Sequence, residues 1–281
     1  MRAIIILSCV WSLLAAGCGD SASSAGGREK VVAAFYPLAF AAQEIGGDKV
    51  EVENLTPAGA EPHDLEISPR DVRDLREADL VLLLGHGFQP ELEKAAGNGD
   101  EVLSLLDTPG LNRFPNGDPH VWLDPQRYLL IVRRIGSALH EESSTQSFVT
   151  RLRALDRDYR RGLAHCARRE IVTSHEAFAY LSQRYGLRQV AITGLAPEAE
   201  PAPRDLQHVI ELVRETHATT IFFETLVSPR IAETVARETG AKTAVLNPIE
   251  GLTPAEKRGG ENYFTVMRAN LANLRLALGC R

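Results

Sequence analysis

The chain has 281 residues, of which 44% are hydrophobic and 24% are charged. This is the composition of an ordinary globular protein, long enough for two domains or one large one. The formal net charge of −6 argues against a nucleic-acid-binding protein, which would usually carry a basic face, and it is mildly favourable for attracting cations.

The first residues have the pattern of a bacterial export signal. A short positive start precedes an almost continuously apolar run over residues 3–16, too short to cross about 30 Å of hydrocarbon. Small residues before Cys18 resemble a lipobox, although Ala15 stands where leucine is commoner. We therefore expect a signal peptide over residues 1–18, lipidation at Cys18 and a flexible tether over residues 19–29. A plain cleaved signal with an uninvolved cysteine is the alternative.

Beyond the tether, short apolar runs alternate with amphipathic segments. In the N-terminal half we expect strands over residues 31–35, 50–55 and 80–84, and helices over residues 37–45 and from Ser68-Pro69 onward. In the C-terminal half we expect strands over residues 171–174, 189–192, 220–223 and 243–246, and helices over residues 176–185, 205–216, 228–239 and 262–278. Alternation of apolar strands with helices is typical of βα units around parallel sheets.

One long helical segment separates the two halves. Residues 145–166 contain no proline and one glycine, and apolar side chains recur there every three or four residues. The predicted fold class is therefore α/β, with parallel-rich sheets flanked by helices in two lobes, residues 30–142 and 168–281. A rigid helix within residues 143–167 joins the lobes.

Four cysteines are present, and Cys9 and Cys18 belong to the export segment. Disulfides persist in exported proteins, so Cys166 and Cys280 form a candidate bridge, with two free thiols as the alternative. Neither has a second cysteine at a short spacing, and His165 is adjacent to Cys166, so that the two side chains would point apart on a helix. They are therefore poor zinc ligands.

Three histidines occupy similar settings. His63 follows the expected strand over residues 50–55, His175 lies between a strand and a helix, and His120 lies in a turn bracketed by prolines. Ligands of open α/β sheets bind beyond the carboxyl ends of the strands. Imidazole suits zinc, copper, iron and nickel, whereas magnesium and calcium sites are built from oxygen. Each histidine alone is weak evidence, since such residues are more often surface or capping residues.

The sequence around these histidines resembles one family over nearly the whole chain after the tether. The motifs are Pro62-His63, the block Asp-Pro-His-Val-Trp-Leu-Asp-Pro at residues 118–125, residues 173–181 and residues 246–253. Together they resemble the zinc and manganese substrate-binding proteins of ABC importers, in their zinc type. The resemblance implies two α/β lobes joined by one long helix, with the metal held in the cleft between them.

The resemblance also implies a ligand set. His63 and His120 are the implied ligands from the N-terminal lobe, and His175 is the first from the C-terminal lobe. Manganese-preferring members tend to carry glutamate at the position of His175, so histidine favours Zn²⁺ and leaves Mn²⁺ open. Many members have aspartate where this chain has Asn247, and a neutral amide is a poor zinc ligand. Glu250 is the expected fourth ligand, with water as its main rival.

The expected function is extracytoplasmic capture of Zn²⁺ as bound substrate by a monomer, which hands it to an ABC permease powered by a cytoplasmic ATPase. The location is the outer face of the cytoplasmic membrane, through a lipid anchor, or the periplasm. The chain has no His-Glu-x-x-His and no Gly-x-Ser-x-Gly motif, so an enzyme is not expected and a zinc hydrolase is a distant rival. A surface adhesin of the same family is the other alternative.

Several residues near the expected ligands have two possible roles. Glu61 and Glu66 can orient His63 as hydrogen-bond acceptors or can be exposed loop carboxylates. Glu224, after the strand over residues 220–223, can line the cleft or cap the next helix. His86 is expected to be a loop residue rather than a ligand.

Overall fold

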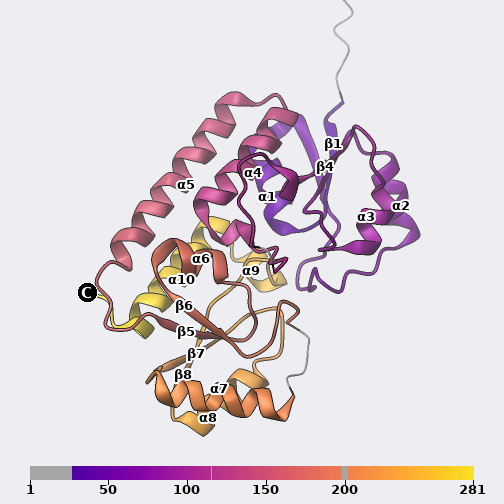
Figure 1. Ribbon diagram of the computed structural model, residues 1–281. Helices are drawn as coiled ribbons and strands as arrows, with labels where there is room; N and C mark the ends of the chain where they lie inside the picture. Colours follow the sequence, from indigo (N-terminus) through magenta and orange to yellow (C-terminus); the bar gives the residue numbers. More distant parts are fainter. Residues whose placement is uncertain (1–26, 115, 198–201) are drawn as a thin grey trace, which may run out of the picture.

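The computed structural model describes residues 27–114, 116–197 and 202–281. The expected signal peptide and Cys18 lie outside these residues. The described chain folds into two lobes, each built on a four-stranded parallel sheet flanked by helices (Figure 1). The predicted α/β fold class is confirmed.

The N-terminal lobe has its strands in the order β2-β1-β3-β4, all parallel. Its strands are β1 (Glu29–Ala33), β2 (Val50–Asn54), β3 (Leu80–Leu83) and β4 (Val102–Ser104). Its helices are α1 (Tyr36–Gly46), α2 (Pro69–Arg76), α3 (Pro90–Ala96) and α4 (Pro125–Ala138), with short 3₁₀ turns η1 (Gly47–Lys49), η2 (Leu105–Asp107) and η3 (Val121–Leu123).

The C-terminal lobe repeats this arrangement, with the strand order β6-β5-β7-β8. Its strands are β5 (Glu170–Thr173), β6 (Arg188–Ala191), β7 (Thr220–Phe223) and β8 (Lys242–Val245). Its helices are α6 (Ala179–Tyr185), α7 (Pro203–Glu215), α8 (Arg230–Thr239), α9 (Pro254–Arg258) and α10 (Tyr263–Leu278). In both lobes the strand order reverses beside the first strand, and such a switch point is where α/β sheets bind ligands.

The long helix α5 (Glu142–Gly162) runs along one side of the molecule beside both lobes (Figure 1). Its buried stripe includes Phe148, Leu152, Leu155 and Tyr159, and it packs on α4, α1 and α10. The helix ends four residues before Cys166, the last residue of the expected helical segment. Cys166 forms a disulfide with Cys280, which fastens the last residues of the chain beside the end of α5.

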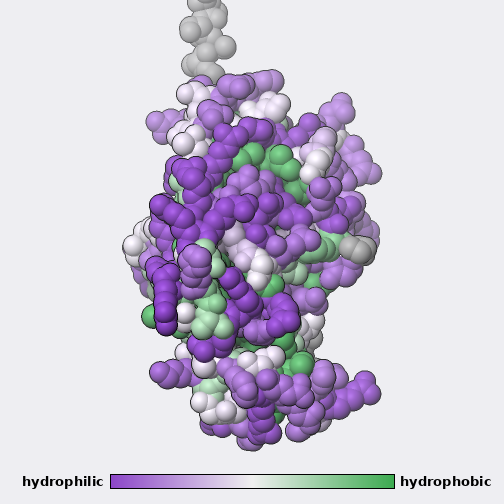
Figure 2. Space-filling model, turned by 60° about the vertical axis from the view of Figure 1, so that its left-hand side comes forward, coloured by the Kyte–Doolittle hydropathy of each residue, from purple (hydrophilic) through white to green (hydrophobic). Residues whose placement is uncertain are grey.

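One hydrophobic core extends through both lobes. It runs from the N-terminal sheet through α1, α4 and α5 to α10 and the loop after β8, while a smaller core lies between the C-terminal sheet and α7 and α8. On the face shown in Figure 2, hydrophilic side chains cover most of the surface and hydrophobic atoms show mainly in recesses. Within the described ranges, no helix has the length and apolar character needed to cross a membrane.

The sequence prediction omitted α3, β4, α4 and α9 and misplaced the starts of α5, α6, α7 and α8 by two or three residues. Helix α6 begins at Ala179, three residues after the expected start. The reason is local hydrogen bonding, because the carbonyl of His175 accepts from Thr173 Oγ1 and from Gln189 Nε2. These bonds hold His175 in an irregular turn outside the helix. Helix α2 begins as expected, with Ser68 in a reciprocal capping box.

Candidate metal centre

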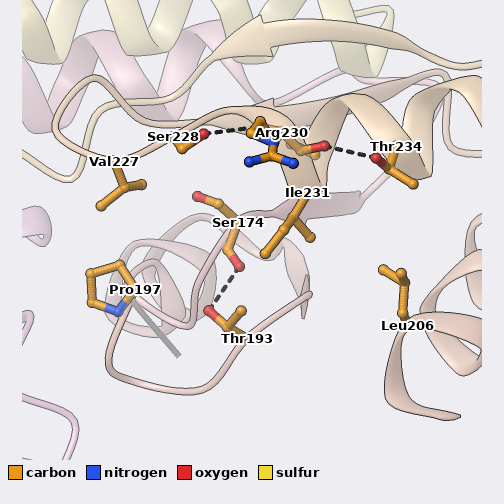
Figure 3. Close-up of a pocket in the computed structure, with 10 residues that line it drawn as sticks. Ser174, Thr193, Pro197, Leu206, Val227, Ser228, Arg230, Ile231 and Thr234 are labelled. Atoms are coloured by element: carbon orange, nitrogen blue, oxygen red, sulfur yellow. Dashed lines mark hydrogen bonds between the residues drawn. The ribbon is translucent and has the colours of Figure 1, made fainter. Parts of the chain in front are cut away.

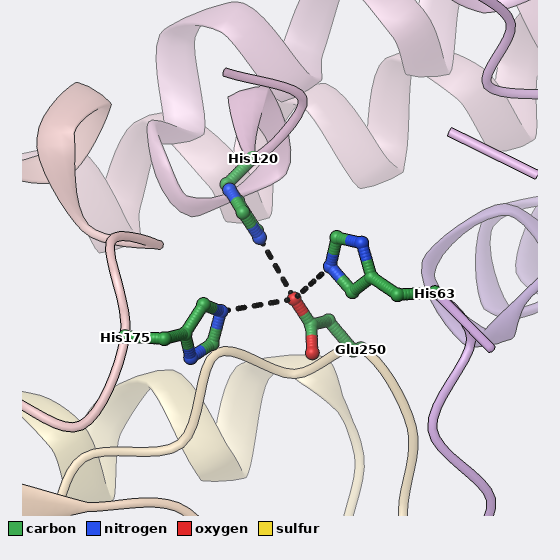
Figure 4. Close-up of side chains that lie close together, drawn as sticks. All are labelled: His63, His120, His175 and Glu250. Atoms are coloured by element: carbon green, nitrogen blue, oxygen red, sulfur yellow. Dashed lines mark hydrogen bonds and ion pairs between the residues drawn. The ribbon is translucent and has the colours of Figure 1, made fainter. Parts of the chain in front are cut away.

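Three histidine rings surround one carboxylate oxygen between the two lobes (Figure 4). The Nε2 atoms of His120, His63 and His175 lie 2.9, 3.3 and 3.5 Å from Oε1 of Glu250. One possible ligand atom from each of the four side chains lies within 4.8 Å of the others. His120, His175 and Glu250 are fully buried, and the side chain of His63 is 13% exposed.

The three distances between histidine nitrogen and the Glu250 oxygen can be compared with the edges of a tetrahedral zinc shell. Zinc lies about 2.0–2.1 Å from histidine nitrogen and about 2.0–2.2 Å from carboxylate oxygen, so neighbouring ligand atoms stand about 3.3–3.5 Å apart. The three N–O distances, 2.9, 3.3 and 3.5 Å, lie close to this range. Among the described residues, Nε2 of His175 and Oε2 of Glu250 are buried without a hydrogen-bond partner. A bound cation would satisfy both atoms.

All four side chains come from the carboxyl-end side of parallel strands. His63 lies in the loop after β2, His120 precedes η3 in the loop after β4, His175 follows β5, and Glu250 lies in the loop after β8. Each lobe therefore supplies two of the four, as expected for strands whose carboxyl ends face one cleft.

The backbone at Glu250 is held in an unusual conformation. The preceding residue, Ile249, has a φ of 60°, which is rare for a β-branched residue. Two hydrogen bonds fix this turn. The Ile249 N–H donates to Asn247 Oδ1 at 2.7 Å, and the indole of Trp122 donates to the carbonyl of Pro248 at 2.7 Å. The second bond joins the two lobes directly beside the site.

Asn247 lies outside the cluster. Its amide nitrogen donates to Thr225 Oγ1 and Glu256 Oε1, and its amide oxygen accepts from Ile249. Both ends of this side chain are therefore used in building the turn that carries Glu250.

Two further carboxylates orient the histidine rings. Asp118 Oδ1 lies 2.7 Å from Nδ1 of His120 and also accepts its backbone N–H at 2.9 Å. Glu224 Oε1 lies 2.8 Å from Nδ1 of His175 and accepts from Ser174 Oγ at 2.6 Å. With the proton held on Nδ1, each ring directs Nε2 toward Glu250, the arrangement found around metal-ligating histidines.

These contacts shift the pKa values of the site. Burial alone would lower the pKa of His175, but Glu224 and Glu250 raise it to about 10. Burial alone would also lower the pKa of His120, but Asp118 and Glu250 raise it. Burial would raise the pKa of Glu250, but the three histidines hold it well below its usual range. These directions favour protonated His120 and His175 beside an ionised Glu250 when no metal ion is bound.

Glu61 belongs to the same electrostatic system. Its Oε1 accepts the backbone N–H of His63 at 3.2 Å. Burial, followed by the neighbouring Glu250 carboxylate, raises the pKa of Glu61 to about 9. A cation among these carboxylates would lower this pKa.

The remaining candidates lie away from the cluster. Glu66 is exposed, and His86 pairs with Asp107 at 2.6 Å on the surface. Asp124 caps α4 and pairs with Arg184, so it fixes the turn after His120. The sequence reading assigned no role to Asp118, although its position two residues before His120 was a usable signal. The contact between Glu224 and His175 could not be read from two segments 49 residues apart.

A separate hollow of about 410 Å³ lies in the C-terminal lobe (Figure 3). Ser174 and Thr193 line one side, and Arg230 and Ile231 at the start of α8 line another. Its lining, as far as the structure describes it, contains no histidine, cysteine or carboxylate, so it offers no strong ligand for a transition metal.

The two-lobed fold and the histidine–carboxylate cluster define a metal-binding protein of the periplasmic type. A family model described as zinc-uptake complex component A, periplasmic, matches residues 31–277, and the chain belongs to this family.

Similar proteins include two curated relatives and a solved structure. The zinc-binding lipoprotein AdcA of Streptococcus pneumoniae is 33% identical over 300 residues, which cover 96% of this chain and 60% of that protein. The high-affinity zinc uptake system protein ZnuA of Bacillus subtilis is 32% identical over 309 residues, covering 98% and 96%. The crystal structure of the zinc-bound ZnuA-like domain of Streptococcus pneumoniae AdcA has a TM-score of 0.78 at 34% identity, covering 90% of this chain and 99% of that one. The chain thus spans about 60% of the length of its pneumococcal relative.

Proposed function

We propose that this chain captures Zn²⁺ outside the cytoplasmic membrane and delivers it to an ABC permease driven by a cytoplasmic ATPase. The observation that carries the proposal is the buried convergence of three histidine Nε2 atoms on Glu250 between the lobes. Membership of the zinc-uptake family supports the same function. In this proposal the ligands are His63, His120, His175 and Glu250.

The donor set favours zinc over manganese. Three imidazole nitrogens suit zinc, whereas Mn²⁺ sites are richer in carboxylate oxygen. With three neutral histidines and one carboxylate, the zinc shell has a net charge of +1. Asp118 and Glu224, hydrogen-bonded to the outer nitrogens of two rings, offset this charge in the buried site.

Release follows from the division of the ligands between lobes 30–142 and 168–281. Separation of the lobes would remove two ligands from the ion at once. The linking helix and the continuous core resist separation. We therefore propose that contact with the permease drives release, and that the protein acts as a monomer anchored through lipidated Cys18.

A binding role is better supported than a catalytic one. Catalytic zinc keeps an open coordination position for water or substrate. Here four protein ligands would close a tetrahedral shell with 0% exposure of three of them. No feature of the cluster favours the adhesin alternative over zinc capture.

Metal analysis and competition titration test this proposal. The purified protein is expected to bind one Zn²⁺. Zn²⁺ should readily displace Mn²⁺ from the protein. His120→Ala should abolish tight binding, and His86→Ala, which removes the surface histidine paired with Asp107, should leave it unchanged. Tightly bound Mn²⁺ that Zn²⁺ cannot displace would refute the zinc assignment, and equal binding by His120→Ala would refute the site.

A further inference from the structure

Three carboxylates form a second cluster beside the histidine shell. Glu61, Glu224 and Glu250 each place one oxygen within 4.8 Å of the others. Glu224 is 2% exposed and Glu250 is fully buried. Each of these carboxylates already uses one oxygen on a histidine. Glu61 accepts the backbone N–H of His63, Glu224 contacts the ring of His175, and Glu250 faces the three Nε2 atoms.

The other oxygens of this cluster have no partner. Oε2 of Glu61, Glu224 and Glu250 is buried in each case and makes no hydrogen bond to any described residue. Unpaired buried carboxylate oxygens are costly, and three such groups close together also repel one another. A positively charged ligand is the chemistry that relieves both effects, and hard carboxylate oxygens accept a partly hydrated divalent cation without displacing all its water.

One member of the cluster, Glu61, lies closer to solvent than the other two. Of the four candidate ligands, His63 alone has an exposed portion, 13% of its side chain, while the others are at 0%. Glu61 lies two residues from His63 in the same loop and is only partly buried. Glu61 and His63 are therefore closer to solvent than the fully buried His120 and His175.

We propose that Glu61, Glu224 and Glu250 form a loading position that receives the incoming divalent cation before the histidines bind it. This inference rests on the proposed function of the histidine site. Glu250 belongs to both positions, so the ion can move into the histidine shell by exchanging Glu61 and Glu224 for imidazole nitrogens without leaving Glu250. Spontaneous dissociation, in the absence of the permease, follows the same route in reverse, because forward and reverse transfer share one path.

The test compares Glu61→Gln with Glu66→Gln. Glutamine at position 61 keeps an oxygen for the His63 N–H and removes one carboxyl group from the cluster, whereas Glu66→Gln removes a carboxyl group from an exposed position of the same loop. Association of Zn²⁺ alone would be followed by stopped-flow fluorescence of Trp122, whose ring centroid lies 5.2 Å from that of His120. Equilibrium affinity would be measured by competition with a chelator.

Glu61→Gln is expected to slow association by about tenfold or more, because the arriving ion loses one carboxyl ligand of the loading position. Its Kd should stay within about threefold of wild type, so dissociation slows in parallel. Glu61→Asp, which keeps a carboxyl group at this position, should restore most of the rate. The loading position is refuted if Glu61→Gln associates as fast as Glu66→Gln, or if its Kd weakens while the association rate is unchanged. The proposed function fails separately, through absence of zinc binding by the wild-type protein.

Discussion

The carboxylate of Glu250 is the ligand on which the zinc site depends most, since its Oε1 faces the Nε2 atoms of all three histidines at 2.9 to 3.5 Å. Glu250→Gln keeps the shape and removes the charge that a buried cation requires. Removing one partner of a buried ion pair costs about 3–5 kcal/mol, which corresponds to a roughly 150- to 4,000-fold weaker zinc affinity. Competition titration with a chromophoric chelator at fixed pH measures this change.

Asn247→Ala is the matched control for Glu250→Gln. It removes hydrogen bonds to Thr225, Glu256 and Ile249 but no proposed ligand. It should lower the free energy of unfolding by about 1–3 kcal/mol, the usual cost of leaving buried partners unsatisfied, and weaken zinc affinity less than Glu250→Gln, because it loosens the turn that carries Glu250 but leaves that ligand in place. If Glu250→Gln binds zinc within a few fold of wild type, or if Asn247→Ala loses more affinity, water or Asn247 completes the shell instead.

Three further outcomes follow from the site and the disulfide. His175→Glu replaces a nitrogen ligand with oxygen and should shift preference toward Mn²⁺, so a variant with unchanged zinc-over-manganese selectivity in competition titrations would contradict the assignment. His175 has its pKa raised to about 10 by Glu224 and Glu250 against the effect of burial, so at pH 7 zinc must displace its proton. Apparent affinity should rise about tenfold per pH unit below that pKa. In the metal-free protein the same shift stabilises the fold fully below pH 6.5, and this contribution is lost as the pH rises through about 10. Calorimetry in buffers of different ionisation enthalpy should detect at least one released proton, and none would refute the protonated site. Replacing Cys166 and Cys280 by serine opens a linkage of 114 residues and should lower the free energy of unfolding by about 2–5 kcal/mol in urea titrations, with zinc affinity retained.

Local patterns determined much of the fold. The buried strand β3 and the capped start of α2 are visible as an apolar run and a Ser-Pro pair, because both depend on residues next to one another. Helix α4 escaped the sequence reading although Asp124-Pro125 signals its start.

The sequence by itself predicted His63, His120 and His175 as metal ligands and Glu250 as the fourth, because each lies in a recognisable local motif. Only the tertiary structure decided which groups meet. In the folded chain Asn247 accepts the Ile249 N–H and stabilises the turn before Glu250. Glu224, 49 residues from His175 along the chain, contacts the His175 ring. Such contacts depend on how two parallel sheets face each other across a cleft, and no spacing along the chain encodes that distance.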